Sequence, residues 1–565
     1  MTRGPVAPKD PVKKRESFYI MYDKEISAAK QPNGKGIQPI YLNDGRLVSS
    51  AQIVGNVTNQ TMLDMLVKTA DFRKLVHSIG VSIITYKQED EAEFVLQMYG
   101  KKDLYGSGTL ITRKITTDGM ENVIELEKVS WSDDDDIVGQ LRFEFPDACM
   151  ANVSVRFYLQ DGFKAPVVEQ DAPIDYKSDA YQKMIQQSLM LAGNNYRLKK
   201  AIDKARKGKP VTMAFIGGSI TQGAGATPLP EECYARKTYE NFKKTYAMND
   251  NVTFVKAGVG GTPSELGMIR YEREVLDDGS LEPDIVVVEF AVNDEGDETK
   301  GVCFESLVRK ILYSPGKPAV ILLFAVFADD TNLQERLAPI GRQYNLPMVS
   351  LKNAVTEQFT QSREEGRVLS KNQYFYDRYH PSNVGHRIMT DCLCYLFQQV
   401  DGAVTDLEED YTTVRPVLGA EFENVKLLDK KDNFVQASIS CGAFTATDTD
   451  LQCVERNTNA MGTPEFPYNW MKEENVTGES FQMEITCKAL VLVHKDSAVV
   501  SVGKADVFVD GKYVRTADPH INNWTHCNPL VILNEKKSTR HQVEIRMAEG
   551  DEKKSFTILG FGYVE

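Results

Sequence analysis

Continuous apolar runs alternate with amphipathic segments between residues 194 and 402, and this alternation limits the fold more than any other feature of the chain. The predicted strands are 211–216, 252–257, 284–290, 319–327 and 348–351. The predicted helices are 235–247, 263–276, 304–312, 334–344 and a last one that begins near 383. Strands that are apolar on both faces need cover on both sides. The pattern therefore predicts an α/β fold built on a three-layer, doubly wound parallel sheet.

The segments on either side of this region are β-rich. Short runs of β-branched and aromatic residues occur at 81–86, 93–99, 123–131, 137–145 and 152–159, with one predicted helix at 61–78. Near the C-terminus, Asp510 and Gly511 separate two strand-like runs, which predicts a tight hairpin. We therefore expect three domains. They are an N-terminal β-rich domain over 1–180, the α/β domain over 181–402, and a C-terminal domain over 416–565, the two β-rich ones being sandwich-like or jelly-roll-like.

Composition restricts the partners of the protein. The 565 residues carry a formal net charge of −14, which disfavours nucleic acid and anionic membranes as partners. The N-terminal segment lacks the apolar core of a signal peptide, and we find no run of about 18 apolar residues of the kind that spans a membrane. The nine cysteines are scattered and include no Cys-x-x-Cys motif. We therefore expect reduced thiols and a cytoplasmic location.

Glycines and small polar residues follow three of the predicted strands. They are Gly217-Gly218-Ser219 after the first, Gly258-Val259-Gly260-Gly261-Thr262 after the second, and Val292-Asn293-Asp294 after the third. Because the carboxyl ends of parallel strands meet at one edge of a sheet, where ligands bind, we expect these groups to lie together. A serine hydroxyl that faces glycine amides and the Asn293 side chain would combine a nucleophile with donors for a developing negative oxygen.

A serine nucleophile needs a base, and His380 is the best candidate among the seven histidines. It follows the last predicted strand, and Pro381 disfavours the helical conformation at His380, which keeps it in the loop before the last helix. Asp377, three residues earlier, can fix the tautomer of the imidazole and stabilise its charged form. His386 is an alternative base, but it falls inside the predicted helix.

Other uses of these glycines fit the sequence less well. Pro263 stands where a dinucleotide-binding fingerprint needs a glycine, and the lysine of a phosphate-binding loop is missing after Gly223. The chain also has neither His-Glu-x-x-His nor a paired-cysteine motif, which are the usual marks of a zinc site. We therefore expect neither a cofactor nor a metal.

Together, the motifs between about residues 190 and 400 resemble those of the SGNH/GDSL hydrolases. The matching positions are Ser219 in the first block, Gly261 in the second with Gly260 as its rival, Asn293 in the third, and Asp377 and His380 in the last. The resemblance implies a catalytic triad of Ser219, Asp377 and His380. It also implies an oxyanion hole formed by the Ser219 amide, an amide near Gly261 and the Asn293 side chain.

Two positions depart from the family pattern. The first block reads Gly-Gly-Ser rather than Gly-Asp-Ser, and Ala291 replaces the glycine that usually precedes Val292-Asn293-Asp294. Both are turn positions, so they bear on the subfamily more than on the chemistry. The family implies hydrolysis of carboxylic esters. Members fused to β-sandwich domains resemble carbohydrate esterases, so we expect removal of O-acetyl groups from oligo- or polysaccharides such as xylan or mannan fragments. The motifs leave the oligomeric state open.

The polar stretch 518–528 holds Trp524, which we predict to bind substrate by stacking its indole on a sugar ring. Two other functions stay open. A carbohydrate-binding or scaffold protein with a degenerate hydrolase core is one, and the intact motifs count against it. The other is a lipid esterase or acyltransferase. Such a protein is expected to have an apolar lid segment, which we do not find in the sequence.

Overall fold

The computed structural model describes residues 15–565 apart from 31–33, 43–47, 49–50, 52, 55–59, 86–90, 166–170, 363, 432–436, 458 and 523. The chain divides into two compact units. The first contains Met1–Asp175, Gly225–Pro228 and Arg367–Gly385. The second contains Tyr176–Ala224, Leu229–Gly366 and His386–Glu565.

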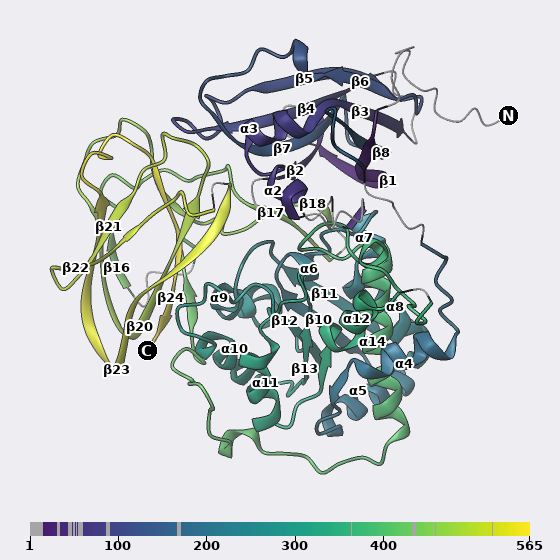
Figure 1. Cartoon of the computed structure of the whole chain (residues 1–565). Coiled ribbons are helices and arrows are strands. Elements are labelled where there is room, and N and C mark those ends of the chain that lie inside the picture. Colours follow the sequence, from purple (N-terminus) through teal and green to yellow (C-terminus); the bar gives the residue numbers. More distant parts are fainter. Residues whose placement is uncertain are drawn as a thin grey trace. The chain divides into compact units, whose positions relative to one another are not determined.

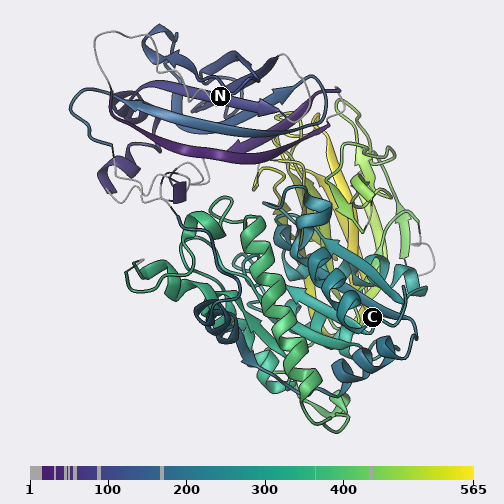
Figure 2. The ribbon, with the colours of Figure 1, turned by 90° about the vertical axis from the view of Figure 1, so that its right-hand side faces the viewer.

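Eight strands form the sheet of the first unit, in the order β5-β4-β7-β2-β1-β8-β3-β6 (Figure 1). They are β1 Ser17–Lys30, β2 Gly36–Tyr41, β3 Val76–Thr85, β4 Glu91–Gly100, β5 Leu110–Thr116, β6 Asn122–Glu125, β7 Asp135–Phe145 and β8 Cys149–Leu159. Side chains alternate between the two faces, as at Ala151, Val153 and Val155 of β8, which are buried in the core of this unit. Figure 2 shows these strands as long, curved ribbons lying side by side. The predicted β-rich character of this region is confirmed.

Two predictions for this region are wrong. The helix expected at 61–78 is replaced by α2 (Gln60–Asp64) and α3 (Thr69–Leu75), followed directly by β3. The β-branched residues from Val76 onward pair with β8 instead, because tertiary pairing outweighs local helical spacing. The strand expected at 123–131 ends at Glu125 and continues as the 3-10 helix η1 (Leu126–Lys128). Position 86, the expected end of another strand, lies outside the described residues.

A six-stranded sheet forms the centre of the second unit, in the order β11-β10-β12-β13-β14-β9. Its strands are β9 Leu189–Leu191, β10 Val211–Gly217, β11 Val252–Gly258, β12 Ile285–Glu289, β13 Ala319–Phe324 and β14 Met348–Ser350. The five predicted strands are confirmed and run parallel, whereas the short edge strand β9 is antiparallel and was not predicted. Gly217 pairs with both Gly258 and Glu289, so three strands end at one level.

Helices lie on both sides of this sheet (Figure 1). α9, α10 and α11 lie on one side, and α4, α5, α8 and α14 lie on the other. The helices of this part of the chain are α4 Asp179–Gln187, α5 Tyr196–Arg206, α6 Ser219–Gln222, α7 Leu229–Glu232, α8 Tyr234–Tyr246, α9 Ser264–Glu274, α10 Val302–Leu312, α11 Gln334–Gln343, α12 Leu351–Thr360, α13 Lys371–Tyr374 and α14 Asn383–Gly402, with 3-10 turns η2 Asp277–Gly279 and η3 Tyr411–Thr413. The predicted helices match α8, α9, α10, α11 and α14.

The C-terminal strands also belong to the second unit. They are β15 Lys426–Leu428, β16 Ala437–Ser440, β17 Cys453–Arg456, β18 Asn459–Pro464, β19 Trp470–Lys472, β20 Phe481–Asp496, β21 Ala505–Val509, β22 Lys512–Ala517, β23 His526–Met547 and β24 Phe556–Val564. The main sheet has the order β15-β24-β20-β23-β21-β22, with β16 on β20 and β19 on β24. The predicted hairpin at Asp510-Gly511 is confirmed, since φ values of +52° and +73° place both residues in the left-handed region that a type I′ turn requires.

One hydrophobic core joins the α/β sheet to the C-terminal strands within the second unit. It includes Leu266 and Ile269 of α9, Val491 of β20 and Leu559 of β24. A Cβ added to Gly562 would lie 2.6 Å from Ile269 Cγ1, so glycine is needed where α9 packs on β24. In the part of the chain that the structure describes, no helix combines the length and the apolar character needed to cross a membrane.

Candidate active site

Ser219 lies in a tight turn at the carboxyl end of β10. The strand ends at Gly217, and the short helix α6 begins with Ser219. The Ser219 carbonyl accepts hydrogen bonds from the amides of Gly223 and Ala224, both at 2.9 Å. Gly223 has a φ of +115°, a conformation that favours glycine and closes the turn. The backbone thus holds the half-buried serine at a fixed place on the sheet edge.

Asn293 packs against the backbone that leads into Ser219. A Cβ added to Gly218 would lie 2.3 Å from Asn293 Oδ1 and 2.8 Å from Asn293 Nδ2, so only glycine leaves room for this amide. The main-chain N–H of Asn293 donates to the Phe290 carbonyl at 2.9 Å, in the turn after β12. The structure therefore brings Ser219 and Asn293 together from the ends of two neighbouring strands.

The glycine loop after β11 passes beside the same turn. A Cβ added to Gly260 would lie 3.8 Å from Ser219 Cβ, and the Gly260 N–H donates to Gln222 Oε1 at 2.9 Å. Because the Gln222 side chain already accepts from that amide, Gly261 is the better of the two glycines for an oxyanion donor. Gly261 itself has a φ of +72°. A larger residue there would be strained.

Arg270 of α9 ties two strand ends together. Its side chain is buried, with Nη1 donating to the Ala257 carbonyl and Nη2 to the Gly217 carbonyl, both at 2.9 Å. Nη1 also pairs with the Glu274 carboxylate one turn further along α9. Arg270 therefore fixes the spacing between β10 and β11 just before their loops begin. Its role was not predicted from the sequence, because no short motif marks a buried arginine of this kind.

Asp377 and His380 form a hydrogen-bonded pair in the first unit. His380 Nδ1 lies 3.0 Å from both carboxylate oxygens of Asp377. Asp377 Oδ1 also accepts from the main-chain N–H groups of Tyr379 at 2.8 Å and His380 at 3.0 Å. The structure thus brings these two predicted residues together, while Ser219 and Asn293 belong to the second unit. An imidazole held this way through Nδ1 keeps Nε2 as its other reactive nitrogen.

Lys24 of β1 approaches the Asp377 loop, a contact that was not predicted from the sequence. Its Nζ donates to the Phe375 carbonyl at 3.3 Å and lies 5.9 Å from the centroid of the Tyr376 ring. A β-bulge between Met21 and Lys24 alters the register of β1 and re-aims the side chain. Burial lowers the pKa of Lys24 to about 8, while the Asp377 charge opposes that shift. Lys24 comes from a segment some 350 residues away in the chain, and no local pattern reveals that pairing.

His386, the alternative base, has both ring nitrogens committed to the main chain. Nδ1 accepts from the Tyr234 N–H at 3.2 Å, and Nε2 lies 3.1 Å from the Ala224 carbonyl. The residue is fully buried in α14. These bonds hold α14 against the start of α8 and the end of the Ser219 turn, so the geometry gives His386 a structural role.

Trp524 lies beside the glycine loop. A Cβ added to Gly261 would lie 3.0 Å from Trp524 Cζ2, so the absence of a side chain at Gly261 makes room for the indole. Trp524 is 37% exposed, which leaves part of the ring free for a ligand. The structure therefore places the predicted sugar-binding residue beside the glycine loop, whose Gly260 lies near Ser219. Asn523, the preceding residue, lies outside the described residues.

Two buried carboxyl groups support the loops of the site. Burial raises the pKa of Glu289, at the end of β12, to about 8, although Thr221 Oγ1 donates to its Oε2 at 3.2 Å. Burial also raises the pKa of Asp294 to about 7. Its carboxyl accepts from the Ser264 N–H at 2.8 Å and the Ser264 hydroxyl at 2.6 Å, which fixes the start of α9 to the Asn293 turn.

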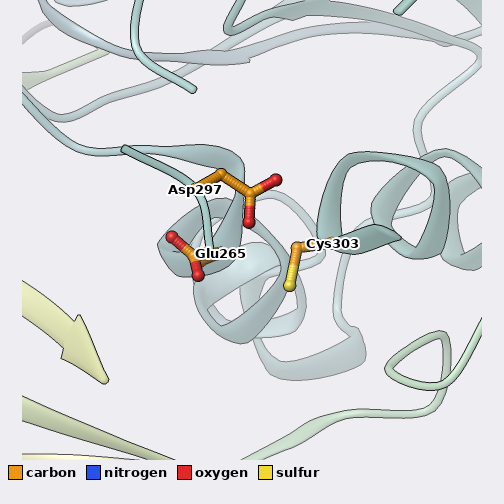
Figure 3. Close-up of side chains that lie close together, drawn as sticks. All are labelled: Glu265, Asp297 and Cys303. Carbon is orange, nitrogen blue, oxygen red and sulfur yellow. The ribbon is translucent and has the colours of Figure 1, made fainter. Parts of the chain in front are cut away.

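A third buried group, Glu265, lies next to Asp297 and Cys303 (Figure 3). Their oxygen and sulfur atoms lie within 4.8 Å of one another. Burial, followed by the neighbouring Asp297 charge, raises the pKa of Glu265 to about 9, and burial raises that of Cys303. The Asp297 carboxylate accepts from the amides of Thr299 at 2.7 Å and Gly301 at 2.6 Å. These main-chain hydrogen bonds fix the Asp297 carboxylate in the turn that leads into α10.

The buried carboxyl groups predict how stability changes with pH. Glu265, Glu289 and Asp294 have folded pKa values above the value near ~4 of an unfolded carboxyl, so the folded state keeps protons that the unfolded chain has released. Their contribution is fully present below about pH 4, and it is lost progressively as pH rises from there to the folded pKa values of about 7 for Asp294, about 8 for Glu289 and about 9 for Glu265. We expect the free energy of unfolding to fall over this range, by up to ~1.4 kcal/mol per pH unit for each such proton.

Urea unfolding at several pH values from about 6 to about 9 measures this slope. Glu289→Gln removes one of the titrating groups and should flatten the slope. The matched variant Glu549→Gln, which changes an exposed glutamate, should leave the slope as it is in the wild type. A slope that Glu289→Gln leaves unchanged would contradict the assignment of Glu289 as a proton-holding group.

Comparison with known proteins places this α/β region in a class. Residues 215–388 match the model of the GDSL-like Lipase/Acylhydrolase family, and this segment contains Ser219, Asn293, Asp377 and His380. The resemblance to SGNH/GDSL hydrolases predicted from the motifs is therefore confirmed for this segment of the chain. The comparison with curated proteins gives no match.

Among solved structures, the chain is similar to a two-domain esterase (CEX) active on acetylated mannans, with 27% identity and a TM-score of 0.57. The match covers 67% of this chain and 99% of that chain. A structure of such an esterase co-crystallised with mannopentaose matches with 28% identity and a TM-score of 0.55, over 67% of this chain and 98% of that chain. The structural comparison thus supports the predicted resemblance to carbohydrate esterases.

Proposed function

We propose that the protein is a serine esterase that removes O-acetyl groups from hemicellulose-type oligo- or polysaccharides, with mannan fragments as the first candidates and xylan fragments as the second. The main support for ester hydrolysis by Ser219 is the packing of the Asn293 side-chain amide against the backbone just before Ser219. This packing places a candidate oxyanion donor, the Asn293 side chain, next to the candidate nucleophile. The similarity to esterases active on acetylated mannans supports the class of substrate. Action inside the cell stays a prediction from the sequence.

In the proposed acylation step, Ser219 Oγ attacks the acetyl carbonyl carbon and His380 takes the hydroxyl proton. The carbonyl oxygen becomes negative as the tetrahedral intermediate forms, and the amides of Ser219 and Gly261 and the Asn293 side chain donate to it. The intermediate collapses when the bond from the acyl carbon to the sugar oxygen breaks. His380 then gives its proton to that oxygen, and the deacetylated sugar leaves.

In the proposed deacylation step, His380 takes a proton from a water molecule that attacks the acetyl-serine. The bond to Ser219 Oγ breaks, the serine recovers its proton from the imidazolium, and acetate leaves. Asp377 holds the imidazole through Nδ1 at 3.0 Å and stabilises its charged form in both steps. Both steps use side chains and main-chain amides of the protein and a water molecule.

Acetate release tests this proposal. The purified protein is incubated with acetylated manno- and xylo-oligosaccharides, with 4-nitrophenyl acetate and with a long-chain 4-nitrophenyl ester, and acetate or nitrophenol is measured. We expect acetate from acetylated saccharides and poor hydrolysis of the long-chain ester. Rapid hydrolysis of the long-chain ester together with inert saccharides would support a lipid esterase instead. Binding of saccharides with no hydrolysis of any ester would support the degenerate, carbohydrate-binding alternative.

Trp524→Ala is expected to lower kcat/KM for acetylated oligosaccharides by about 10-fold, since a lost stacking contact is worth ~1–2 kcal/mol. The loss on 4-nitrophenyl acetate should be smaller, because that substrate has no sugar ring to stack. Tyr513→Ala, which removes an aromatic side chain that is 57% exposed on β22, serves as the matched control and should change neither rate. Equal losses on both substrates with a lower Tm would show that Trp524 is needed for packing rather than for the sugar.

A further inference from the structure

The Asp377 loop, Arg367–Gly385, folds with the N-terminal β-rich part of the chain. It belongs to the first compact unit, whereas the residues just before it and just after it in the sequence belong to the second. Side chains of the loop bind the segment that follows the N-terminal sheet. Asn372 Nδ2 donates to Asp171 Oδ2, and Gln373 Nε2 donates to the Ala172 carbonyl, both at 2.8 Å. The N-terminal part of the chain therefore holds this loop in place.

Lys24 of β1 binds the same loop directly before Asp377. The hydrogen bond from its Nζ reaches the Phe375 carbonyl, and the ammonium also lies over the Tyr376 ring at the distance of a cation–π contact. A hydrogen bond from a charged donor is stronger than one between neutral groups. The half-buried Lys24 side chain thus fixes the two residues that precede Asp377 in the chain.

The backbone of β1 is shaped so that it presents Lys24 to the loop. In the bulge between Met21 and Lys24, Asp23 has a φ of +46°, in the left-handed region that few residues other than glycine adopt. Bonds to β8 hold it there, since its main-chain N–H donates to Ser154 Oγ at 2.9 Å and its Oδ1 accepts from Asn152 Nδ2 at 2.7 Å. Bulges occur next to active sites, where they re-aim a side chain, and the bulge in β1 fits that use.

The charge of Lys24 acts on Asp377. Burial lowers the pKa of Lys24 to about 8, and the Asp377 charge opposes this shift, so most of the lysine is protonated at pH 7 and loses its proton just above. Opposite charges favour each other's ionised forms. The neighbouring ionisable groups on the two elements are Asp23 and Glu25 of β1 and Tyr376 and Arg378 of the loop, and the residue paired with Lys24 on β8 is the uncharged Val153.

We propose that Lys24 is a positioning residue for ester hydrolysis, whose ammonium holds the main chain before Asp377 and keeps the Asp377 carboxylate ionised. An ionised Asp377 orients the His380 imidazole through Nδ1 and stabilises its charged form. This inference rests on the proposed function. It makes the N-terminal β-rich part of the chain a component of the catalytic machinery, through one residue that lies some 350 positions before the loop.

The test measures kcat and KM on 4-nitrophenyl acetate from about pH 6 to about pH 10. Lys24→Met keeps the length of the side chain and removes its charge and its donor. We expect it to lower kcat at pH 7 by about 10-fold to 10²-fold, the range for a misplaced catalytic group, with little change in KM. Lys114→Met is the matched control, because that lysine is exposed on β5 and pairs with Glu91, and it should keep the wild-type profile.

The pH profile separates a role of the charge from a role in packing. In the wild type, kcat should fall as pH rises through about 8, because Lys24 loses its proton there. Lys24→Met should lack this fall. Lys24→Arg stays charged at every pH of the assay, so it should recover most of the activity at pH 7 and keep it to higher pH than the wild type. If Lys24→Met does not fold, the comparison of Lys24→Arg with the wild type still tests the inference.

Two results would overturn this inference while the wild type still hydrolyses esters. One is a wild-type kcat and pH profile in Lys24→Met. The other is a kcat that falls at the same pH in Lys24→Arg as in the wild type, and equal losses with a lower Tm in both variants would then assign Lys24 to packing alone. A wild-type protein that hydrolyses no ester at any pH would overturn the proposed function and this inference with it.

Discussion

Ser219→Ala is expected to lower kcat for ester hydrolysis by about 10³-fold or more, because the groups of a catalytic triad act as a unit and the nucleophile has no substitute. Alanine keeps the Cβ and removes only the hydroxyl. The turn is held by main-chain bonds from Gly223 and Ala224 to the Ser219 carbonyl, so the fold should survive the change. The measurement is kcat on 4-nitrophenyl acetate and on acetylated manno-oligosaccharide, with Tm determined for the same samples.

Ser280→Ala is the matched control, since that serine is exposed and bonds only locally, with its hydroxyl 2.5 Å from Asp277 Oδ2. It should keep wild-type turnover. Wild-type turnover in Ser219→Ala would show that another group is the nucleophile. Loss of activity accompanied by a large drop in Tm would show that Ser219 supports the fold rather than the chemistry.

The α/β sheet could be predicted closely because each of its central strands is a continuous apolar run. Buried on both faces and bounded by polar or glycine residues, such runs have few alternative structures. The segment 61–78 shows the opposite case. Its apolar spacing fits a helix, yet from Val76 onward the chain pairs with β8. The edge strand β9 has only three residues and depends on pairing with β14, so no local sequence pattern predicts it.

The residues of the candidate site also fall into two groups, those that the sequence could predict and those that it could not. Ser219 and Asn293 could be found because the ends of parallel strands meet at one edge of the sheet. The Asp377–His380 pair could be found because the histidine follows the aspartate by three positions. Arg270 and Lys24 could not be found this way. The role of each depends on a partner that is distant in the chain, such as the Gly217 carbonyl for Arg270. The role of a buried charge can be recognised only when the fold shows which groups surround it.

Asp377→Asn is expected to lower kcat/KM by about 10²-fold to 10⁴-fold, the range in which loss of the triad carboxylate falls. Asp377 Oδ1 accepts from the main-chain N–H groups of Tyr379 and His380 at 2.8 and 3.0 Å, and asparagine can keep these bonds with its carbonyl oxygen. Its amide nitrogen would then replace Oδ2, which lies 3.0 Å from His380 Nδ1. A donor at that place favours the tautomer with the proton on Nε2, and that nitrogen can no longer accept the serine proton.

The prediction separates chemistry from folding because the asparagine variant keeps the size of the side chain and its main-chain bonds. We expect its Tm to stay close to that of the wild type while kcat falls and KM changes little, since Asp377 acts through His380 rather than on the sugar. Asp401→Asn, which breaks an ion pair with Arg206 on the surface at 2.6 Å, is the matched control and should keep wild-type kcat. A kcat in Asp377→Asn close to that of the wild type would mean that His380 needs no carboxylate to orient it, and the proposed triad would then reduce to a serine–histidine pair.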